Sequence, residues 1–437
     1  MSHRDFRVRA GQASGPARWT GLCAGAVAIT IAVSGCGFVG SGNDASKDGS
    51  GTVSAYVSTE QGTGLTPLVE AFEKESGLTL SMKSAPTADL NEQLRVQLTS
   101  GTAADVFRVS PGFSSPVAVG ALGSQGELAD LSKASWTGSM NDSIRQMSSV
   151  DGKVFAFPIG QNAIVMAFNK SVFQKAGVQP PTTWSELLAA CEKLQAAGVT
   201  PISAGFTGGV SLQFWVYALA ASLVYGPDPQ LNDKMLADEV NFADHPAWTT
   251  VFQKILDLKK YMTPQANGVS IDQSTADVAQ GRAAMQLMVS SSLPGLFSGS
   301  AGGAADFDVF ALPATDDASS TRLPVAPDFL AVKKDAPMED VEKLLGFLAK
   351  PENVKQYAEK LGVLPGLDVA SDAKVDALAP VLPLAEGKRT TAFANYLWPN
   401  GSTQQRMLQS GQQLIAGEIK IPALLAQMDA EFDKGTP

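Results

Sequence analysis

Histidine and cysteine are scarce in this sequence of 437 residues. It contains two histidines, His3 and His245, and three cysteines, Cys23, Cys36 and Cys191. A nucleophile–histidine triad needs a histidine beside the attacking group, and a protein zinc site needs several histidine or cysteine ligands. Three cysteines also cannot build a disulfide scaffold. We therefore expect no catalytic residues, no metal and no cofactor.

Basic residues are outnumbered. The chain has 33 Lys and Arg against 43 Asp and Glu, a formal net charge of −10. Four of the arginines lie in the first 35 residues beside a single aspartate, so the remainder holds 29 basic and 42 acidic residues, a balance of −13. Nucleic-acid binding needs basic patches that replace phosphate counterions, and this composition argues against it.

An apolar run long enough to span a membrane is missing from the N-terminal region. Residues 21–33 (GLCAGAVAITIAV) form a run of 13 residues, and a bilayer requires roughly 20. Arginines precede this run and small residues follow it, which is typical of a secretory signal. The arginines are not adjacent, so a twin-arginine signal is not indicated. We predict a signal peptide over 1–35.

The run ends in Val33-Ser34-Gly35-Cys36, which resembles a bacterial lipobox, although that motif prefers Leu where Val33 stands. The resemblance implies that Cys36 is lipidated and anchors the protein to the outer face of the cell membrane. Residues 37–51 are rich in Gly, Ser and Asp and are expected to be a flexible tether, reaching roughly 20 Å. The alternative is an ordinary cleavage site beside an unrelated cysteine.

The length predicts two domains, because single hydrophobic cores stop growing at roughly 250–300 residues. Strands and helices alternate after the tether: strand 52–58, helix 65–76, strand 78–82, helix 89–100 and strand 105–109. Gly77 and Gly101 end the two helices. This alternation predicts a parallel sheet, and ligands bind at the carboxyl ends of such strands. Residues 59–61 and 108–113 are therefore expected near a ligand.

The next segment contains clear turn and cap signals. Asp151-Gly152 predicts a hairpin turn, and strands are expected over 154–158 and 163–169 with Gly160 between them. Thr183 and Glu186 form a capping box at the start of a helix. Cys191 lies on the apolar face of that helix, which favours a buried packing residue over a reactive thiol.

Several short motifs then occur in a particular order. They are Gly152-Lys153-Val154 with Phe157-Pro158, Phe168-Asn169-Lys170, Pro181-Thr182-Thr183-Trp184, Thr200-Pro201-Ile202, Gly281-Arg282-Ala283-Ala284-Met285, residues 345–357 followed by Gly362-Val363-Leu364-Pro365, and residues 408–425. Their order and spacing resemble the extracellular solute-binding proteins of carbohydrate importers, the family that includes maltose-binding protein. The resemblance covers nearly the whole chain after the tether.

This resemblance implies an α/β, two-lobed, type II periplasmic-binding-protein fold, in which each lobe is a mixed, mostly parallel sheet flanked by helices. A carbohydrate would lie in the cleft between the lobes and pass to the membrane permease subunits of an ABC importer. We expect a monomer, with one lobe formed by 52–160 and 304–366 and the other by 163–303 and 367–437.

The resemblance also implies a set of ligand-binding residues. They combine polar side chains that can form hydrogen bonds with sugar hydroxyls and aromatic rings that can stack on a sugar. They are Glu60, Gln61, Arg108, Ser110, Asn162, Phe214, Trp215, Ser290, Ser291, Asp328, Tyr396 and Trp398. Relatives often carry an aromatic platform shortly after Met285, where this chain has serines. The loss of that platform favours a short or polar ligand and leaves more of the stacking to Trp398.

Some of these residues have structural alternatives. Trp398 precedes a loop signal and is expected to stack on a sugar, but core packing is the competing interpretation. Trp215 lies in an apolar helix, where packing and stacking are both plausible roles. Asp328 could serve local turn geometry, and Arg108 could pair with an acidic neighbour.

Two other functions remain open at the level of sequence. One is a binding protein for a non-sugar solute such as a polyol, a phosphodiester or a peptide, although a phosphorylated ligand would want several basic residues in the cleft. The other is an exported glycoside hydrolase, because acidic residues are plentiful and could form a catalytic pair. No glycine-rich phosphate loop is present.

Overall fold

The computed structural model describes residues 51–369 and 375–435, which belong to one compact unit, Asp48–Pro437. The predicted signal peptide, the lipidation site Cys36 and nearly all of the predicted tether lie outside the described residues. None of the helices in those two ranges is both long and apolar enough to cross a membrane.

The strands of the described residues are β1 (Thr52–Ser58), β2 (Thr79–Ala85), β3 (Val106–Val109), β4 (Ser149–Val150), β5 (Lys153–Val154), β6 (Ala156–Asn169), β7 (Thr200–Ile202), β8 (Ala283–Val289), β9 (Phe307–Phe310), β10 (Leu323–Val332), β11 (Leu364–Pro365) and β12 (Thr390–Ala392). The α-helices are α1 (Thr59–Ser76), α2 (Thr87–Ser100), α3 (Val119–Ser124), α4 (Asp142–Met147), α5 (Lys170–Lys175), α6 (Trp184–Ala196), α7 (Leu212–Ala220), α8 (Leu231–Leu236), α9 (Pro246–Leu258), α10 (Ile271–Ala279), α11 (Leu293–Ser298), α12 (Met338–Leu348), α13 (Pro351–Leu361), α14 (Leu382–Glu386), α15 (Gly401–Ala416) and α16 (Ile421–Phe432).

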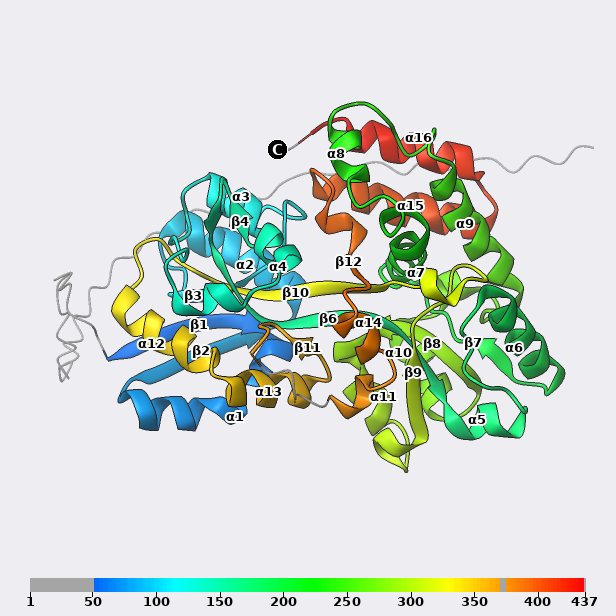
Figure 1. Ribbon diagram of the computed structural model, residues 1–437, viewed down its shortest axis with the longest axis horizontal. Coiled ribbons are helices and arrows are strands. Elements are labelled where there is room, and N and C mark those ends of the chain that lie inside the picture. Colours follow the sequence, from blue (N-terminus) through cyan, green and yellow to red (C-terminus); the bar gives the residue numbers. More distant parts are fainter. Residues whose placement is uncertain (1–50, 370–374, 436–437) are drawn as a thin grey trace, which may run out of the picture. The chain divides into compact units, whose positions relative to one another are not determined.

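One mixed sheet runs through the described chain in the order β2-β1-β3-β10-β6-β8-β7. β1 pairs in parallel with β2 and β3, and β7 pairs in parallel with β8, whereas β10 is antiparallel to both β3 and β6. The end with β1, β2 and β3 forms the first lobe, and the end with β7, β8 and β9 forms the second (Figure 1). The predicted two-lobed α/β fold is confirmed.

Two long strands connect the lobes. β6 pairs with β10 through its residues 156–163, and through residues 164–169 it pairs with β8 and β9 of the second lobe. β10 continues from β12 to β3, so it also runs from one lobe to the other (Figure 1). Because β9 pairs with the second-lobe part of β6, the chain returns to the first lobe within β10 rather than near residue 304. The exact lobe boundaries stay a prediction.

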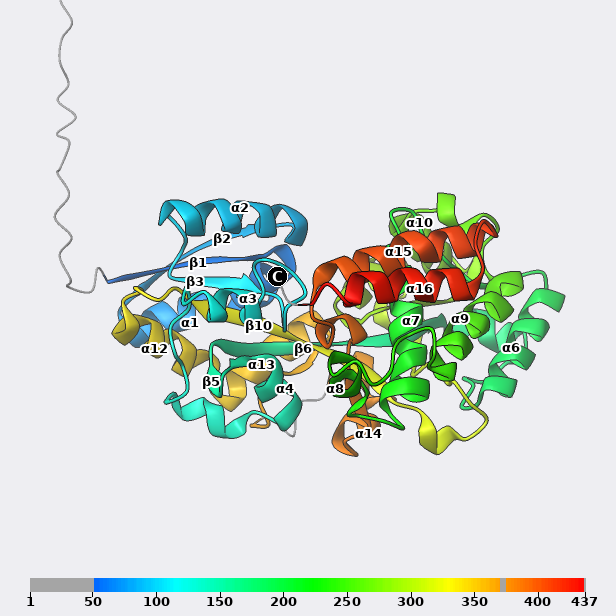
Figure 2. The same ribbon diagram turned by 90° about the horizontal axis from the view of Figure 1, so that it is seen from above.

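Helices cover the sheet in each lobe. α1, α12 and α13 pack side by side on the first lobe, and α2 lies over β1 and β2 on the opposite side (Figure 2). In the second lobe α15 and α16 pack against each other and against α7 and α9. In the first lobe both faces of the sheet are thereby covered, as expected for a sheet with parallel strands.

Local signals in the sequence form as predicted. Thr183 accepts a hydrogen bond from the Glu186 backbone, and the Glu186 side chain accepts one from the Thr183 backbone, which completes the capping box. Gly77 and Gly101 end α1 and α2 in the left-handed conformation. Cys191 is buried, and burial raises the pKa of its thiol to about 12, so it is a packing residue at neutral pH.

Two predicted elements have different bounds. α1 begins at Thr59, directly after β1, and not at residue 65. Ser58 and Gln61 form a capping box there, and this local interaction compensates for glycines at positions 62 and 64 that weaken the helical pattern. The strands expected over 154–158 and 163–169 are instead mostly one continuous strand, β6, which runs through Gly160.

An aromatic cluster fills the core of the second lobe, and Trp398 lies inside it. The indole ring is 1% exposed and packs edge-on against Phe242 with ring centroids 5.6 Å apart. Its Nε1–H donates a hydrogen bond of 3.1 Å to the Tyr225 hydroxyl. Trp215 is 2% exposed in the same core. Neither ring presents a face to a ligand, so the stacking role expected for these two residues is corrected to core packing.

This packing predicts that Trp398→Ala strongly destabilises the ligand-free protein. Removing a buried aromatic side chain leaves a cavity and typically costs about 3–5 kcal/mol of unfolding free energy. Chemical denaturation of the variant measures this cost.

Tyr225→Phe is the matched control, because it removes only the hydroxyl that accepts the indole hydrogen bond and should cost about 1 kcal/mol. A Trp398→Ala variant as stable as the parent protein would contradict the core assignment.

Candidate functional site

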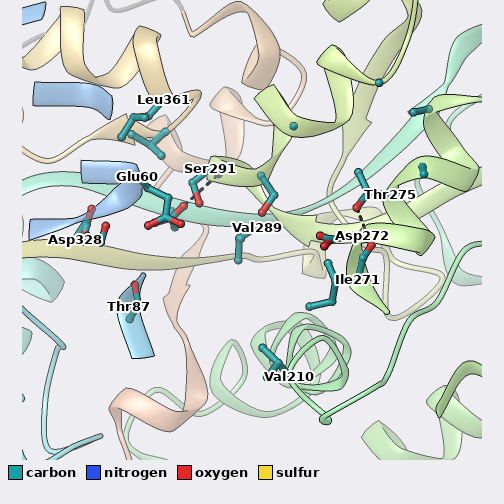
Figure 3. A pocket seen from close by; sticks show the side chains of 18 of the residues that line it. Glu60, Thr87, Val210, Ile271, Asp272, Thr275, Val289, Ser291, Asp328 and Leu361 are labelled. Atoms are coloured by element: carbon teal, nitrogen blue, oxygen red, sulfur yellow. Dashed lines mark hydrogen bonds between the residues drawn. The ribbon is translucent and has the colours of Figure 1, made fainter. Parts of the chain in front are cut away.

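A cavity of about 770 Å³ lies between the two lobes. Residues of both lobes form its walls (Figure 3). The first lobe contributes Ser58, Glu60, Thr87, Arg108, Asp328, Leu361 and Val363, and the second lobe with its adjoining segments contributes Asn162, Val210, Ile271, Asp272, Thr275, Ala276, Ala279, Val289, Ser291, Ser292, Gly295 and Gly299. The volume falls in the range of small-molecule binding sites.

The start of α1 places the first acidic side chain. β1 ends at Ser58 and α1 begins at the next residue, so Glu60 sits in the first helical turn at the carboxyl end of a parallel strand. Ligand contacts are expected at this end of a parallel strand, and Glu60 lines the cavity there.

Asp328 is the most highly connected side chain of the cavity. It lies at an irregularity of the β10–β6 pairing, where the register shifts between Asp328 and Phe329. Its Oδ1 accepts a hydrogen bond of 2.9 Å from Gln61 Nε2, and its Oδ2 accepts one of 3.3 Å from the Tyr357 hydroxyl. Arg108 Nε lies 3.9 Å from Oδ1, and both charged side chains are about 15% exposed.

The close packing of α1 against α13 brings Tyr357 to this carboxylate. A Cβ atom at Gly64 would lie 2.6 Å from the Tyr357 ring, so only glycine lets the two helices approach this closely. The tyrosine ring is buried between α1 and β6, with its hydroxyl directed at Asp328. Helix packing thereby fixes one of the carboxylate's donors.

Burial governs the ionisation of Asp328. Desolvation raises the pKa of this carboxyl from 3.8 to about 6, while Arg108 and the hydrogen bonds from Tyr357 and Gln61 oppose the rise and nearby Glu60 adds to it. The result is a carboxyl group that titrates close to neutral pH in a cleft, which is a feature of functional sites.

The second wall is held by the segment after β8. Asn162 Oδ1 accepts a hydrogen bond of 3.2 Å from the Ser291 backbone, and the buried Ser290 hydroxyl accepts one of 3.1 Å from the Ala163 backbone. The serines that replace an aromatic platform in this chain therefore fasten the turn η5 (Ser290–Ser292) to β6.

One face of α10 forms the opposite side of the cavity. Ile271, Thr275 and Ala279 are spaced four residues apart and line it, with Asp272 in the first turn (Figure 3). Ser270 caps the helix by accepting a hydrogen bond from the Gln273 backbone. None of the ligand-binding residues predicted from the sequence lies on this helix. The Ser270 cap and the mixed stripe of Ile271, Thr275 and Ala279 are the features of the sequence that could have indicated it.

The structure brings five of the predicted ligand-binding residues to the cavity: Glu60, Arg108, Asn162, Ser291 and Asp328. Gln61, Ser110 and Ser290 are buried behind the wall, where they support Asp328, Arg108 and Ala163 by hydrogen bonds. Their predicted direct contact is therefore corrected to a supporting position.

The remaining aromatic candidates do not line the cavity. Phe214 is half-buried on α7 and packs against the second-lobe core. Tyr396 stacks on Phe393 with ring centroids 5.8 Å apart, and burial raises the pKa of its hydroxyl. Together with the burial of Trp215 and Trp398, this leaves no aromatic side chain among the described residues that form the cavity wall. Within the same residues no group of His, Cys, Asp or Glu is placed to hold a metal ion.

Two lobes joined by long strands, with a polar cavity between them, define the class of two-lobed binding proteins. A family model for bacterial extracellular solute-binding proteins matches residues 56–355, and the chain belongs to this family. The resemblance inferred from the sequence motifs is thereby confirmed.

Individual relatives are similar to part of this chain. A protein of Brucella suis named "Probable sugar-binding periplasmic protein" is 29% identical over 194 residues, which cover 41% of this chain and 45% of the relative. The "sn-glycerol-3-phosphate-binding periplasmic protein UgpB" of Brucella abortus is 31% identical over 121 residues, 26% of each chain. The matched region thus spans less than half the length of these curated relatives.

A solved structure shares the fold over nearly its whole length. The structure titled "Chitin oligosaccharide binding protein" superimposes with a TM-score of 0.73 and 19% identity, covering 88% of this chain and 99% of the other. At this identity the likeness concerns the fold.

The raised pKa of Asp328 predicts a pH dependence of stability. Its folded-state pKa of about 6 exceeds the unfolded value near 3.8, so the folded protein binds this proton more tightly. The stabilisation is fully present below the unfolded pKa and is lost as the pH rises through about 6, a change on the order of 3 kcal/mol. Between pH 4 and pH 7 the melting temperature of the wild type should therefore fall relative to that of Asp328→Asn.

Asp233→Asn controls for the loss of one carboxylate, because Asp233 is exposed on α8 and does not line the cavity. Parallel melting curves for the wild type and Asp328→Asn across this pH range would count against the assignment.

Proposed function

We propose that this protein is the exported substrate-binding component of a carbohydrate ABC importer. It holds a monosaccharide or short oligosaccharide between its lobes and delivers it to the membrane permease. The observation that carries the proposal is the composition of the interlobe cavity. Glu60, Arg108, Asn162 and Asp328 offer planar hydrogen-bonding groups, as hydroxyl-rich ligands require.

Aliphatic side chains supply the apolar part of the cavity wall. Val210, Ile271, Val289, Leu361 and Val363 lie among the polar groups. They can contact the C–H faces of a sugar ring without an aromatic platform. This wall favours a short ligand, because a long oligosaccharide gains much of its affinity from successive stacking contacts.

A phosphorylated polyol is the second candidate, since one relative is named for binding sn-glycerol-3-phosphate. The charges of the cavity oppose it. Among the described residues that line the cavity, Arg108 is the basic side chain, and it already faces Asp328. A phosphate group would instead be repelled by the carboxylates of Glu60 and Asp272, which line the same cavity.

We propose that binding proceeds without turnover. Membership of a family of solute-binding proteins supports binding without catalysis. The alternative function, an exported glycoside hydrolase, can be tested directly. Incubation with labelled oligosaccharides should give stoichiometric retention and no cleavage products; released fragments would establish a glycosidase.

A thermal-shift screen against mono- and disaccharides tests the proposed function. A ligand that binds only the folded state raises its stability by RT ln(1 + [L]/Kd), so a matching sugar should raise the melting temperature in proportion to log concentration. Asn162→Ala should weaken binding of that sugar about tenfold, because it removes a hydrogen-bonding amide from the cavity.

Gln273→Ala is the matched control, since this exposed residue lies on α10 but does not line the cavity. Closure of the lobes around the ligand should also reduce the radius of gyration in solution scattering. Failure of every sugar to bind would overturn the proposal.

The lipid anchor is a separate part of the proposal and rests on the motif that ends at Cys36. Cys36→Ala should release the protein from membranes or leave it unprocessed, because the acylated residue is lost. Mass spectrometry of the mature N-terminus decides the matter. An unmodified N-terminus that begins at another residue would disprove the anchor.

A further inference from the structure

Two carboxylates face the cavity from opposite lobes without a partner. Glu60 lies in the first turn of α1, and Asp272 lies in the first turn of α10. Both are exposed, and neither takes part in a hydrogen bond or an ion pair within residues 51–369 and 375–435. Figure 3 shows them on opposite sides of the cavity, with Val289 and Ser291 between them.

The other charges of the cavity balance each other. Asp328 and Arg108 are 3.9 Å apart, and Gln61 and Tyr357 donate further hydrogen bonds to the same carboxylate. Three carboxylates and one guanidinium line the cavity, so Glu60 and Asp272 leave a formal charge of −2 once Arg108 is counted against Asp328.

This charge becomes costly when a solute displaces water. Like charges repel more strongly as the surrounding dielectric falls, and a neutral solute between Glu60 and Asp272 would leave their repulsion uncompensated. The N-terminal ends of α1 and α10 offset part of each charge, but a helix dipole has only a small effect on an exposed side chain. A positive charge on the solute removes the conflict and gains two ion pairs.

The uncharged part of the wall does not select strongly for a neutral ring. No aromatic face is available among the lining residues described, and Val210, 46% exposed at the cavity, contributes only an aliphatic contact. Charge is therefore the feature of this cavity with the greatest power to discriminate among solutes of similar size.

We propose that the solute is a saccharide with a protonated amine, bound with its ammonium group between Glu60 and Asp272. This inference rests on the proposed carbohydrate-binding function and names the class of carbohydrate. The ammonium N–H groups would donate hydrogen bonds to the two carboxylates. The sugar hydroxyls would form hydrogen bonds with Asn162 and with the Arg108–Asp328 pair.

Calorimetric titration with matched sugars tests the inference. The probes are glucosamine, galactosamine, mannosamine and the β-1,4 disaccharide of glucosamine, each compared at neutral pH with its unsubstituted parent and its N-acetylated form. We expect the amine to bind about tenfold more tightly than both neutral forms in at least one configuration, since a partly desolvated ion pair contributes on the order of 1.4 kcal/mol.

Variants assign the preference to the two carboxylates. Glu60→Gln and Asp272→Asn should each reduce the ratio of amine to neutral affinity while changing the ligand-free melting temperature no more than the loss of any other exposed first-turn carboxylate. Asp142→Asn is the matched control, because Asp142 is an exposed carboxylate in the first turn of α4 and does not line the cavity.

The outcomes separate the two proposals. Neutral sugars that bind as tightly as their amines would overturn the inference and leave the carbohydrate-binding function standing. An amine preference that survives both variants would also overturn it. Failure of every amine and neutral sugar to bind would overturn the proposed function together with the inference.

Discussion

The antiparallel pairing of β6 with β10 is the interaction on which the rest of the structure depends. β6 pairs with β10 through its first half and with β8 and β9 through its second half, and β10 pairs in turn with β3. The two strands therefore connect the first-lobe and second-lobe ends of one sheet, and the cavity lies between those ends. Asp328 pairs with Gly160, and the register of the pairing shifts directly after it, at the point where its carboxylate lines the cavity. A local departure from regular strand pairing thus lies next to a central polar group of the site.

The distribution of side chains follows from this arrangement. Large aromatic residues such as Trp248 and Trp398 are used to fill the second-lobe core, where helices must bury wide apolar faces. The cavity is left with carboxylates, one guanidinium, one amide, hydroxyls and aliphatic groups. Its chemistry is therefore that of hydrogen bonding and charge rather than ring stacking.

Asp328 illustrates how packing and electrostatics combine. Its burial alone would favour the neutral acid, while the donors from α1, β3 and α13 favour the carboxylate, and the opposing effects leave its pKa near 6. The ion pair with Arg108 is long, at 3.9 Å, so the hydrogen bond from Gln61 at 2.9 Å is the closer constraint on the carboxylate. The three donors come from segments that are far apart in the sequence.

The sequence by itself determined the local features and the family. The capping box at Thr183, the glycine ends of α1 and α2 and the order of the motifs depend on neighbouring residues, so they are readable without a structure. Glu60 was also predictable, because a parallel strand ends directly before it. Only the tertiary structure decided that Trp398 belongs to the core and that α10 faces the cavity. Both depend on which helices pack against which face of the sheet, and periodicity within one helix shows that a face is buried but not what covers it.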